Sequence, residues 1–115
     1  MDSYKDLIVW NKSFELVIEI YRLVNLFPKS EMFTLSSQIR RSSVSIPSNI
    51  AEGFRRRFAK EHKQFLNIAL GSSAELETHI VIAKELGYIN EDKEQKLIEI
   101  LNHICGMLVN LNKKI

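Results

Sequence analysis

The residues with the greatest capacity for chemistry are the basic residues that gather in the middle of the chain. The stretch from residue 40 to residue 63 holds seven basic and two acidic residues, a difference of five, whereas the whole chain has a net charge of only +2. Five of the seven are arginines, whose planar guanidinium groups bind phosphate or carboxylate through paired hydrogen bonds. We therefore predict a nucleic-acid-binding surface made of Arg40, Arg41, Arg55, Arg56, Arg57, Lys60 and Lys63.

The same charges have two other interpretations. In the first, they form an ordinary solvated surface in which Glu52 pairs with Arg55 or Arg56 one helical turn away, and each such pair stabilises a helix by only about 0.2–0.5 kcal/mol. In the second, they join copies of the chain through charge-assisted hydrogen bonds. The second interpretation predicts an oligomer interface made of Arg40, Arg41, Asn49, Glu52 and Arg56.

Two phenylalanines lie among the arginines. Phe54 and Phe58 could stack on nucleic acid bases, because every base has a flat π-face. Their spacing of one helical turn is more typical of two residues in an apolar core. The sequence leaves this choice open and favours the core.

Other kinds of chemistry have little support in the sequence. It contains no phosphate-binding glycine loop, no His-Glu-x-x-His pair and no CxxC element. Two Glu–His pairs share a helix face, but each is four residues apart, whereas di-metal sites of helical bundles use a spacing of three; the pairs are Glu75 with His79 and Glu99 with His103. We predict no catalytic residue, no metal site and no cofactor.

The elements that carry these residues are helices, because apolar residues recur at alternating spacings of three and four in four segments. The predicted core face of the first segment is Leu7, Trp10, Phe14, Val17, Tyr21 and Val24. That of the second is Met32, Leu35, Ile39, Ser42, Ile46, Asn49 and Gly53. That of the third is Phe65, Ala69, Ser72, Leu76, His79, Ala83 and Leu86. That of the fourth is Leu97, Leu101, Ile104, Leu108, Leu111 and Ile115.

Proline, glycine and capping residues predict the helix boundaries. Pro28 stops the first helix, Ser30 is a candidate N-cap of the second, Gly87 ends the third, and Asn90 caps the fourth. Connections of only a few residues make neighbouring helices run antiparallel. The fold class is therefore all-α, an antiparallel up-down-up-down four-helix bundle formed by a single domain of residues 1–115.

Pro47 lies inside the predicted second helix. Proline has no backbone N–H for the carbonyl of Ser43, so it costs about 3 kcal/mol in a helix and bends it. The hydroxyls of the neighbouring serines are candidates to bond the freed carbonyl, which favours one continuous helix, kinked near Pro47, over two separate helices. On that helix Arg40, Arg41 and Arg55 point away from the apolar face.

The overall composition is that of an ordinary globular protein. Apolar residues make up 45% and charged residues 26% of the 115 residues. No apolar run approaches the roughly 18 residues that a membrane-spanning helix requires. The first residues lack the basic start and apolar stretch of a secretory signal, and the lone Cys105 fits a buried helical position. We expect a cytoplasmic protein.

Three stretches of the sequence resemble a known family. They are "DLIVWNKSFEL", "FPKSEMFTLSSQIRRSSVSIPSNIAEGFRR" and "FLNIALGSSAELETHIVIAKELGYI", and the central motif is Ser-x-x-x-Ile-x-x-Asn-Ile-Ala-Glu-Gly after an Arg pair. Together they are similar to the bacterial four-helix-bundle proteins encoded in intervening sequences of 23S ribosomal RNA genes. A more distant similarity is to the accessory protein of diversity-generating retroelements.

The resemblance implies a cyclic homopentamer with no established enzymatic activity and a suspected role in binding RNA or DNA. The family motif falls on Gln38, Arg40, Arg41, Ser45, Asn49, Glu52, Gly53, Arg56, Glu75 and Glu77. The sequence departs from the family at Phe58 and Ala59, where relatives have a serine or threonine to cap the third helix. We therefore predict a non-enzymatic homo-oligomer that binds nucleic acid through the surface from Arg40 to Lys63, with a structural or protein-interaction ring as the alternative. No membrane or small-molecule partner is expected.

Overall fold

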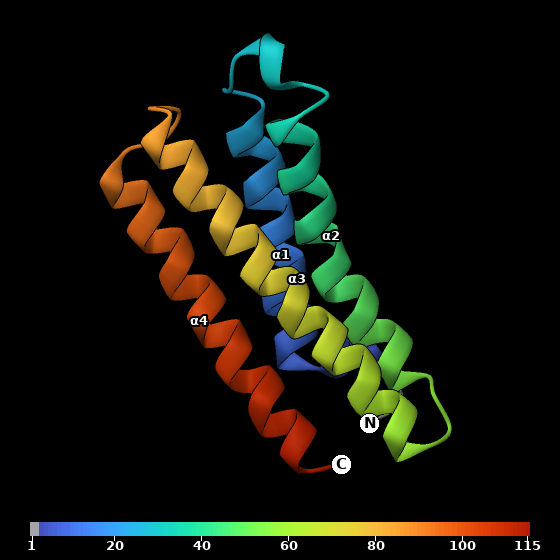
Figure 1. Ribbon diagram of the computed structural model, residues 1–115. Helices are drawn as coiled ribbons and strands as arrows, with labels where there is room; N and C mark the ends of the chain where they lie inside the picture. Colours follow the sequence, from blue (N-terminus) through green and yellow to red (C-terminus); the bar gives the residue numbers. More distant parts are fainter. Residues whose placement is uncertain (1–2) are drawn as a thin grey trace.

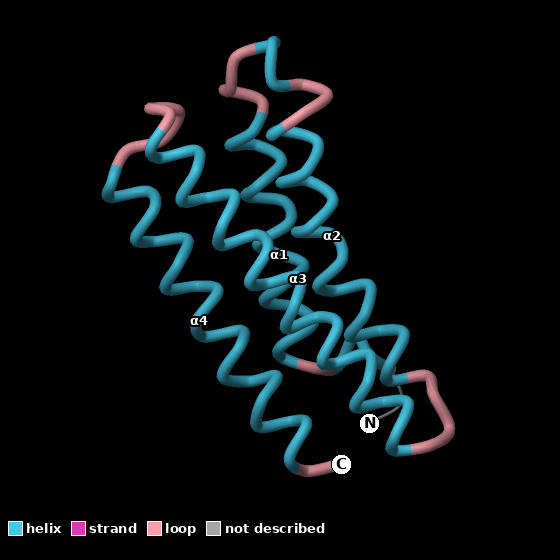
Figure 2. The backbone as a smooth tube through the Cα atoms, viewed as in Figure 1, coloured by secondary structure: helices cyan, strands magenta, loops and turns pink. Residues whose placement is uncertain are grey.

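The computed structural model describes residues 3–115, which form four long helices joined by short connections (Figure 1). The helices are α1 (Ile8–Val24), α2 (Leu35–Phe54), α3 (Ala59–Glu85) and α4 (Glu91–Lys113), with two short 3-10 turns, η1 (Tyr4–Asp6) and η2 (Lys29–Glu31). Figure 2 shows only helix and loop over this range, without any strand. Consecutive helices are antiparallel neighbours and α4 also contacts α1, which confirms the predicted all-α four-helix bundle.

The core lies along the inner faces of all four helices. Its twelve largest fully buried side chains are leucines and isoleucines, and each helix contributes at least two of them. Burying such a side chain contributes about 1.5–3 kcal/mol, so packing of these faces is the main source of stability. Leu97, Leu101, Ile104 and Leu108 of α4 are buried as predicted, and Leu111 and Ile115 pack against the core.

The inner face of α1 differs from the predicted one. Phe14 and Tyr21 are 47% and 42% exposed, and Trp10 and Val17 are only half-buried. The buried residues of this helix are Val9, Ser13, Leu16, Ile20 and Val24. Leu7 and Val24 are buried as predicted, but between them the buried face is displaced by about one helix position. The reason is that α1 has apolar residues on two adjacent faces, and periodicity alone does not show which face meets the core.

The second helix begins later than predicted. Ser30 lies in the 3-10 turn η2 and is not an N-cap; α2 starts at Leu35, after Thr34. Met32 therefore precedes the helix and is 45% exposed. Pro28 and the 3-10 turn extend the connection by several residues, a detail that a capping preference does not predict.

Pro47 lies within one continuous helix, as predicted, but the serines around it do not act as predicted. The Ser42 hydroxyl donates to the carbonyl of Ile39 at 3.2 Å, and that of Ser43 to the carbonyl of Arg40 at 2.8 Å. They therefore bond carbonyls one turn earlier than the carbonyl of Ser43. Pro47 itself is buried in the structure.

The connections between the later helices follow the predicted chemistry. Gly87 has φ of 81°, a left-handed conformation that ends α3. The side chain of Asn90 accepts a hydrogen bond from the backbone N–H of Lys93 at 2.8 Å and caps α4. At the other end of the bundle, the α2–α3 connection lies near the start of α1 and the C-terminus (Figure 1). In the part of the chain that the structure describes, no helix is both long and apolar enough to cross a membrane.

Candidate nucleic-acid interface

The five basic residues from Arg55 to Lys63 gather around the connection between α2 and α3. The guanidinium of Arg55 lies over the ring of Tyr4, 5.4 Å from its centroid, and that of Arg56 lies 4.6 Å from the centroid of Phe65. Arg56 also pairs with Glu52 at 3.6 Å. Within residues 3–115, Arg57, Lys60 and Lys63 form no ion pair, so their charges are free for a ligand.

Arg40 and Arg41 lie apart from this group. Arg41 is 14 residues before Arg55, the residue that caps the end of α2, which is a separation of roughly 21 Å at 1.5 Å per residue. Arg40 is half-buried and donates to the carbonyl of Met32 at 3.2 Å, and Arg41 donates to the side-chain oxygen of Gln38 at 2.6 Å. The seven predicted contact residues therefore form two separate groups.

The fold adds basic residues from the end of α4 to this surface. The side chain of Asn112 bonds the carbonyl of Lys63 at 3.5 Å and the side chain of Asn67 at 3.3 Å, which holds the end of α4 beside the start of α3. Lys113 and Lys114, which follow Asn112, therefore lie at the same end of the bundle as the α2–α3 connection. Their position in the last turn of a helix, where positive charge is favourable, is the only signal that the sequence itself carries for them.

We call this end of the bundle the basic end. Its basic residues are Lys5, Arg55, Arg56, Arg57, Lys60, Lys63, Lys113 and Lys114, and its acidic residues are Asp6, Glu52 and Glu61. Among residues 3–115 it thus holds eight of 16 basic residues and three of 13 acidic residues. The described side chains of this end therefore carry an excess of five positive charges in a near-neutral protein.

The two phenylalanines of the basic end have different environments. Phe54 is half-buried and packs against the core, whereas Phe58 is 64% exposed. Phe58 is the residue before α3 and provides no side-chain cap. The prediction that both rings lie in the core is thus correct for Phe54 and wrong for Phe58. The reason is that α2 ends at Phe54, so the two residues do not share one helix face.

His62 lies beside the basic residues but does not add to their charge near neutral pH. Burial of the imidazole lowers its pKa below the ordinary value of 6.5. Its Nε2 atom is buried and has no hydrogen-bond partner. The ring packs against Gly53 across the α2–α3 crossing, so a packing role explains its position.

The residues predicted for the oligomer interface all have contacts within the chain. Asn49 donates to the carbonyl of Ser45 at 2.7 Å, and Glu52 pairs with Arg56. The hydroxyls of Ser45 and Ser72 are 2.7 Å apart and join α2 to α3. These contacts occupy part of each side chain while Arg41, Glu52 and Arg56 remain exposed.

The Glu–His pairs do not converge on a metal site. Across residues 3–115, no group of three or more His, Cys, Asp and Glu residues is arranged to hold a metal ion. His103 and Glu99 line a cleft beside Lys12 of α1, whereas His79 is half-buried on α3 with no partner for its Nδ1. The two histidines therefore belong to different sides of the bundle.

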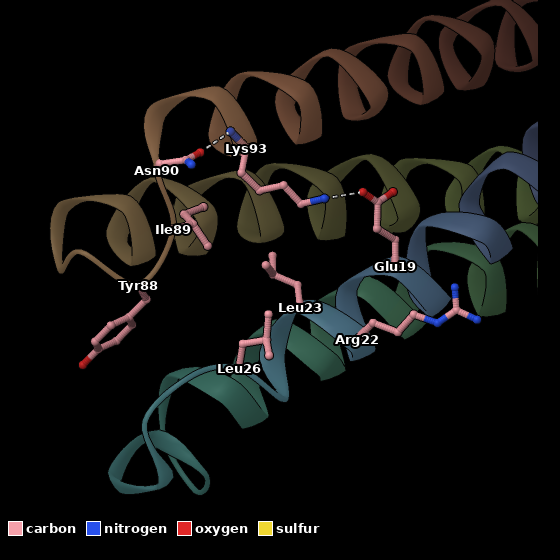
Figure 3. A pocket seen from close by; sticks show the side chains of 8 residues that line it. All are labelled: Glu19, Arg22, Leu23, Leu26, Tyr88, Ile89, Asn90 and Lys93. Atoms are coloured by element: carbon pink, nitrogen blue, oxygen red, sulfur yellow. Dashed lines mark hydrogen bonds and ion pairs between the residues drawn. The ribbon is translucent and has the colours of Figure 1, made fainter.

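A larger cleft, of about 540 Å³, lies far from the basic end, between α1 and the α3–α4 connection (Figure 3). Leu23, Leu26 and Ile89 form its apolar part. Lys93 and Glu19 pair with each other at 2.7 Å across it. These two charges therefore satisfy one another and leave the cleft without convergent polar groups of the kind that fix a small ligand.

Comparison with known proteins identifies the chain. Residues 5–110 match the model of a family described as 23S rRNA-intervening sequence protein. The chain belongs to the 23S rRNA-intervening sequence protein family. A solved structure from Bacteroides thetaiotaomicron, described as a protein with unknown function from the S23 ribosomal protein family, is 28% identical, with a TM-score of 0.85. The similarity covers 92% of this chain and 99% of the other. No curated protein matches the chain.

Membership of this family confirms the recognition made from the sequence motifs. The match spans α1 to α3, most of α4 and both groups of arginines, and it ends before Lys113 and Lys114. The similar solved structure is described as having unknown function. The function of this member must therefore be argued from its own surface.

Proposed function

We propose that this protein is a non-enzymatic, self-associating helical bundle, assembled as a cyclic homopentamer, that binds nucleic acid through its basic end. The observation that supports binding is that, among residues 3–115, eight basic and only three acidic residues lie at one end of a near-neutral protein. Neutralising several phosphates with such residues releases counterions, which is the main source of affinity for nucleic acid. A ring would present the basic end several times and so strengthen a modest interaction.

The free cations of the basic end are the expected phosphate ligands. Arg57, Lys60 and Lys63 have no ion pair among the described residues, and Arg57 and Lys60 are exposed. Arg56 is held over the ring of Phe65, which pre-orders its guanidinium group. Arg40 and Arg41, one helix length away, are assigned to assembly in this proposal.

A purely structural ring is the second candidate function. The observation that favours it is that Arg55 and Arg56 already contact other side chains of the same chain. Arg55 lies over Tyr4, and Arg56 lies over Phe65 and pairs with Glu52, so these contacts give both arginines a structural role without a ligand. In this case the basic end would be solvated and would have no ligand. The two candidates differ in one measurable property, the dependence of nucleic acid binding on salt.

The test compares two triple variants with the same change in charge. The first replaces Arg57, Lys60 and Lys63 with alanine, and the control replaces Lys12, Lys29 and Lys96. Binding of a short duplex and of a single strand is measured by fluorescence anisotropy over a range of salt concentrations. We expect the first variant to lower the slope of log affinity against log salt by about 0.9 for each duplex phosphate that is no longer neutralised. The control should keep the wild-type slope.

Light scattering at each salt concentration separates binding from assembly. We expect both triple variants to remain oligomeric. Equal slopes for the two variants would reject the basic end as the binding surface. Wild-type protein that assembles but does not bind either probe would instead support the structural ring.

A further inference from the structure

The two faces of α1 leave an apolar groove on the outside of the bundle, between α1 and α2. Trp10 stacks on Phe14 at 5.3 Å and meets the edge of Tyr4 at 5.2 Å, and these rings form one wall. The groove has a volume of about 340 Å³ and is lined, without any charged residue, by Tyr4, Trp10, Phe14, Val17, Val44, Pro47, Ser48 and Ala51. Exposed apolar surfaces of this kind are typical of protein interaction sites.

Basic residues stand at both ends of this groove. Arg41, Ser48 and Arg55 are exposed and follow one another at intervals of seven residues, so they share the outer side of α2. The two guanidinium groups are carried by positions roughly 21 Å apart along the helix. Small Ser48 lies midway between them, where the groove is open.

A matching series with the opposite charge lies on α3. Glu61, Ile68 and Glu75 are exposed, and they too are spaced at intervals of seven residues. Ile68 is 44% exposed, and Ile82, the next residue at this spacing, is 41% exposed. We call Glu61, Ile68, Glu75 and Ile82 the α3 stripe. Its charges and its central apolar residue are complementary to the groove and its flanking arginines.

We propose that the groove between α1 and α2 of one copy binds the α3 stripe of a second copy. Ile68 would enter the hollow at Ser48 against the aromatic wall, while Glu75 pairs with Arg41 and Glu61 pairs with Arg55. The proposal rests on the self-association in the proposed function and names the surfaces that produce it. Because the two surfaces differ, the interface is head-to-tail, the type from which rings are built.

The register of this interface follows from the chain itself. The hydrogen bond between Ser45 and Ser72 places these residues at the same height along the bundle. Because α2 and α3 are antiparallel, Arg41 is level with residue 76 and Arg55 with residue 62. Rotation about a ring axis parallel to the bundle does not change the height of any residue. Glu75 and Glu61 are each one residue from these levels, so each arginine of one copy lies within about 1.5 Å in height of its proposed glutamate in the next copy.

The size of the surface and the angle between the two faces suit a small ring. The bundle measures 43 × 25 × 20 Å. A side face of roughly 900 Å² therefore exceeds the ~800 Å² that each partner buries in a stable interface. The α1–α2 face and the face that carries the α3 stripe are neighbouring sides of the bundle, roughly perpendicular to each other, so repeated docking closes after about four or five copies.

Charge reversal tests the proposed pairs. Arg41→Glu and Glu75→Arg are made separately and together, and the mass of each protein is measured by light scattering and native mass spectrometry. We expect each single variant to shift from the oligomer to the monomer and the double variant to recover the oligomer, because the pair is restored with its charges exchanged. Lys12→Glu, on the opposite side of α1, is the matched control and should remain assembled. Circular dichroism shows whether each variant is folded.

A second measurement tests the direction of the interface. Phe14→Asp disables only the groove and Ile68→Asp only the stripe, and both side chains are exposed in the single copy. Mixing the two variants at high concentration should give a dimer of one chain of each, since one intact groove and one intact stripe remain. Assembled single charge variants, or a double variant that stays monomeric, would overturn the proposal. Wild-type protein that is itself monomeric would reject the self-association in the proposed function.

Discussion

At the scale of single residues, the close approach of α2 and α3 depends on a glycine. A Cβ atom at Gly53 would lie 3.0 Å from the Cβ of Phe65 and 3.2 Å from the carbonyl oxygen of His62 on α3. We expect Gly53→Ala to force α2 and α3 apart and to destabilise the protein by about 1–3 kcal/mol, a typical cost of overpacking. Urea unfolding at a fixed protein concentration measures the change.

Gly106 provides the control for this experiment. It lies in α4 with nothing within 4 Å of an added Cβ. Gly106→Ala should be neutral or stabilise the protein by about 0.5–1 kcal/mol, because alanine loses less entropy than glycine in a helix. Equal effects at both positions would show that the α2–α3 crossing is not closely packed.

The exposed ring of Phe58 gives a second prediction at the residue scale. It is surrounded in sequence by Arg57 and Lys60 and is 64% exposed. If bases of a single strand stack on it, Phe58→Ala should weaken binding of a single-stranded oligonucleotide by about 1–3 kcal/mol per stacked base. The substitution removes no helix-cap hydrogen bond, since Phe58 contributes none from its side chain.

Phe33 is the matched control for Phe58. It is 89% exposed, but it lies beside η2 at the opposite end of the bundle. Phe33→Ala should leave binding unchanged, and Phe58→Trp should preserve it. A reduction of duplex binding equal to that of single-strand binding would argue against stacking, because paired bases are not available to the ring.

At the scale of elements, one hydrogen-bond network holds two connections together at the end of the bundle opposite the basic end. The hydroxyl of Tyr88, after α3, donates to the carboxylate of Glu31 in η2 at 2.7 Å, and Thr34 donates to the same carboxylate. Both hydrogen bonds lower the pKa of Glu31. The bond from Thr34 has the largest effect and the bond from Tyr88 the second largest. The bond to Glu31 in turn raises the pKa of Tyr88.

These shifts predict how stability depends on pH. Because the pKa of Glu31 is lower in the folded protein than its ordinary value of 4.5, its contribution is present above that value and is lost as the pH falls through the folded pKa. The raised pKa of Tyr88 has the opposite sign, so that contribution is present below pH 10.0 and is lost as the pH rises through the folded pKa.

Tyr88→Phe should therefore be less stable than the wild type near neutral pH. The difference should shrink in acid, as the pH falls below 4.5 and Glu31 becomes protonated. Thermal unfolding over this pH range measures it, and Tyr21→Phe, which removes an exposed hydroxyl of α1, is the control. A constant difference across the range would contradict the role of Glu31.

The elements also show how far the sequence alone could lead. Periodicity and capping residues predicted the four helices, the end of α3 at Gly87 and the cap at Asn90, because these are local properties. The same periodicity chose the wrong face of α1, since its second apolar face, with Phe14 and Tyr21, has nearly the same pattern. Which face meets the core depends on the other three helices.

The candidate site was also predictable only in part, because part of it is formed by helices that are far apart in the sequence. The arginines of the α2–α3 connection are adjacent in sequence and were found. Lys113 and Lys114 were not, because only the packing of α4 against α3, through Asn112, brings them to the same end. The length of one continuous helix implies the separation of Arg40 from Arg55, so the prediction of one surface from Arg40 to Lys63 was too broad.

At the scale of the whole molecule, the uneven distribution of charge predicts that the basic end acts as one surface. Lys113→Gln combined with Lys114→Gln leaves every arginine intact and changes only the part contributed by α4. If both lysines neutralise phosphates, the salt slope for a duplex should fall by about 1.8, or about 0.9 for each phosphate. Lys29→Gln with Lys84→Gln, at the opposite end, removes the same charge and should change nothing. An unchanged slope in the first variant would confine binding to the α2–α3 connection, and dissociation of the oligomer would show that the end of α4 serves assembly.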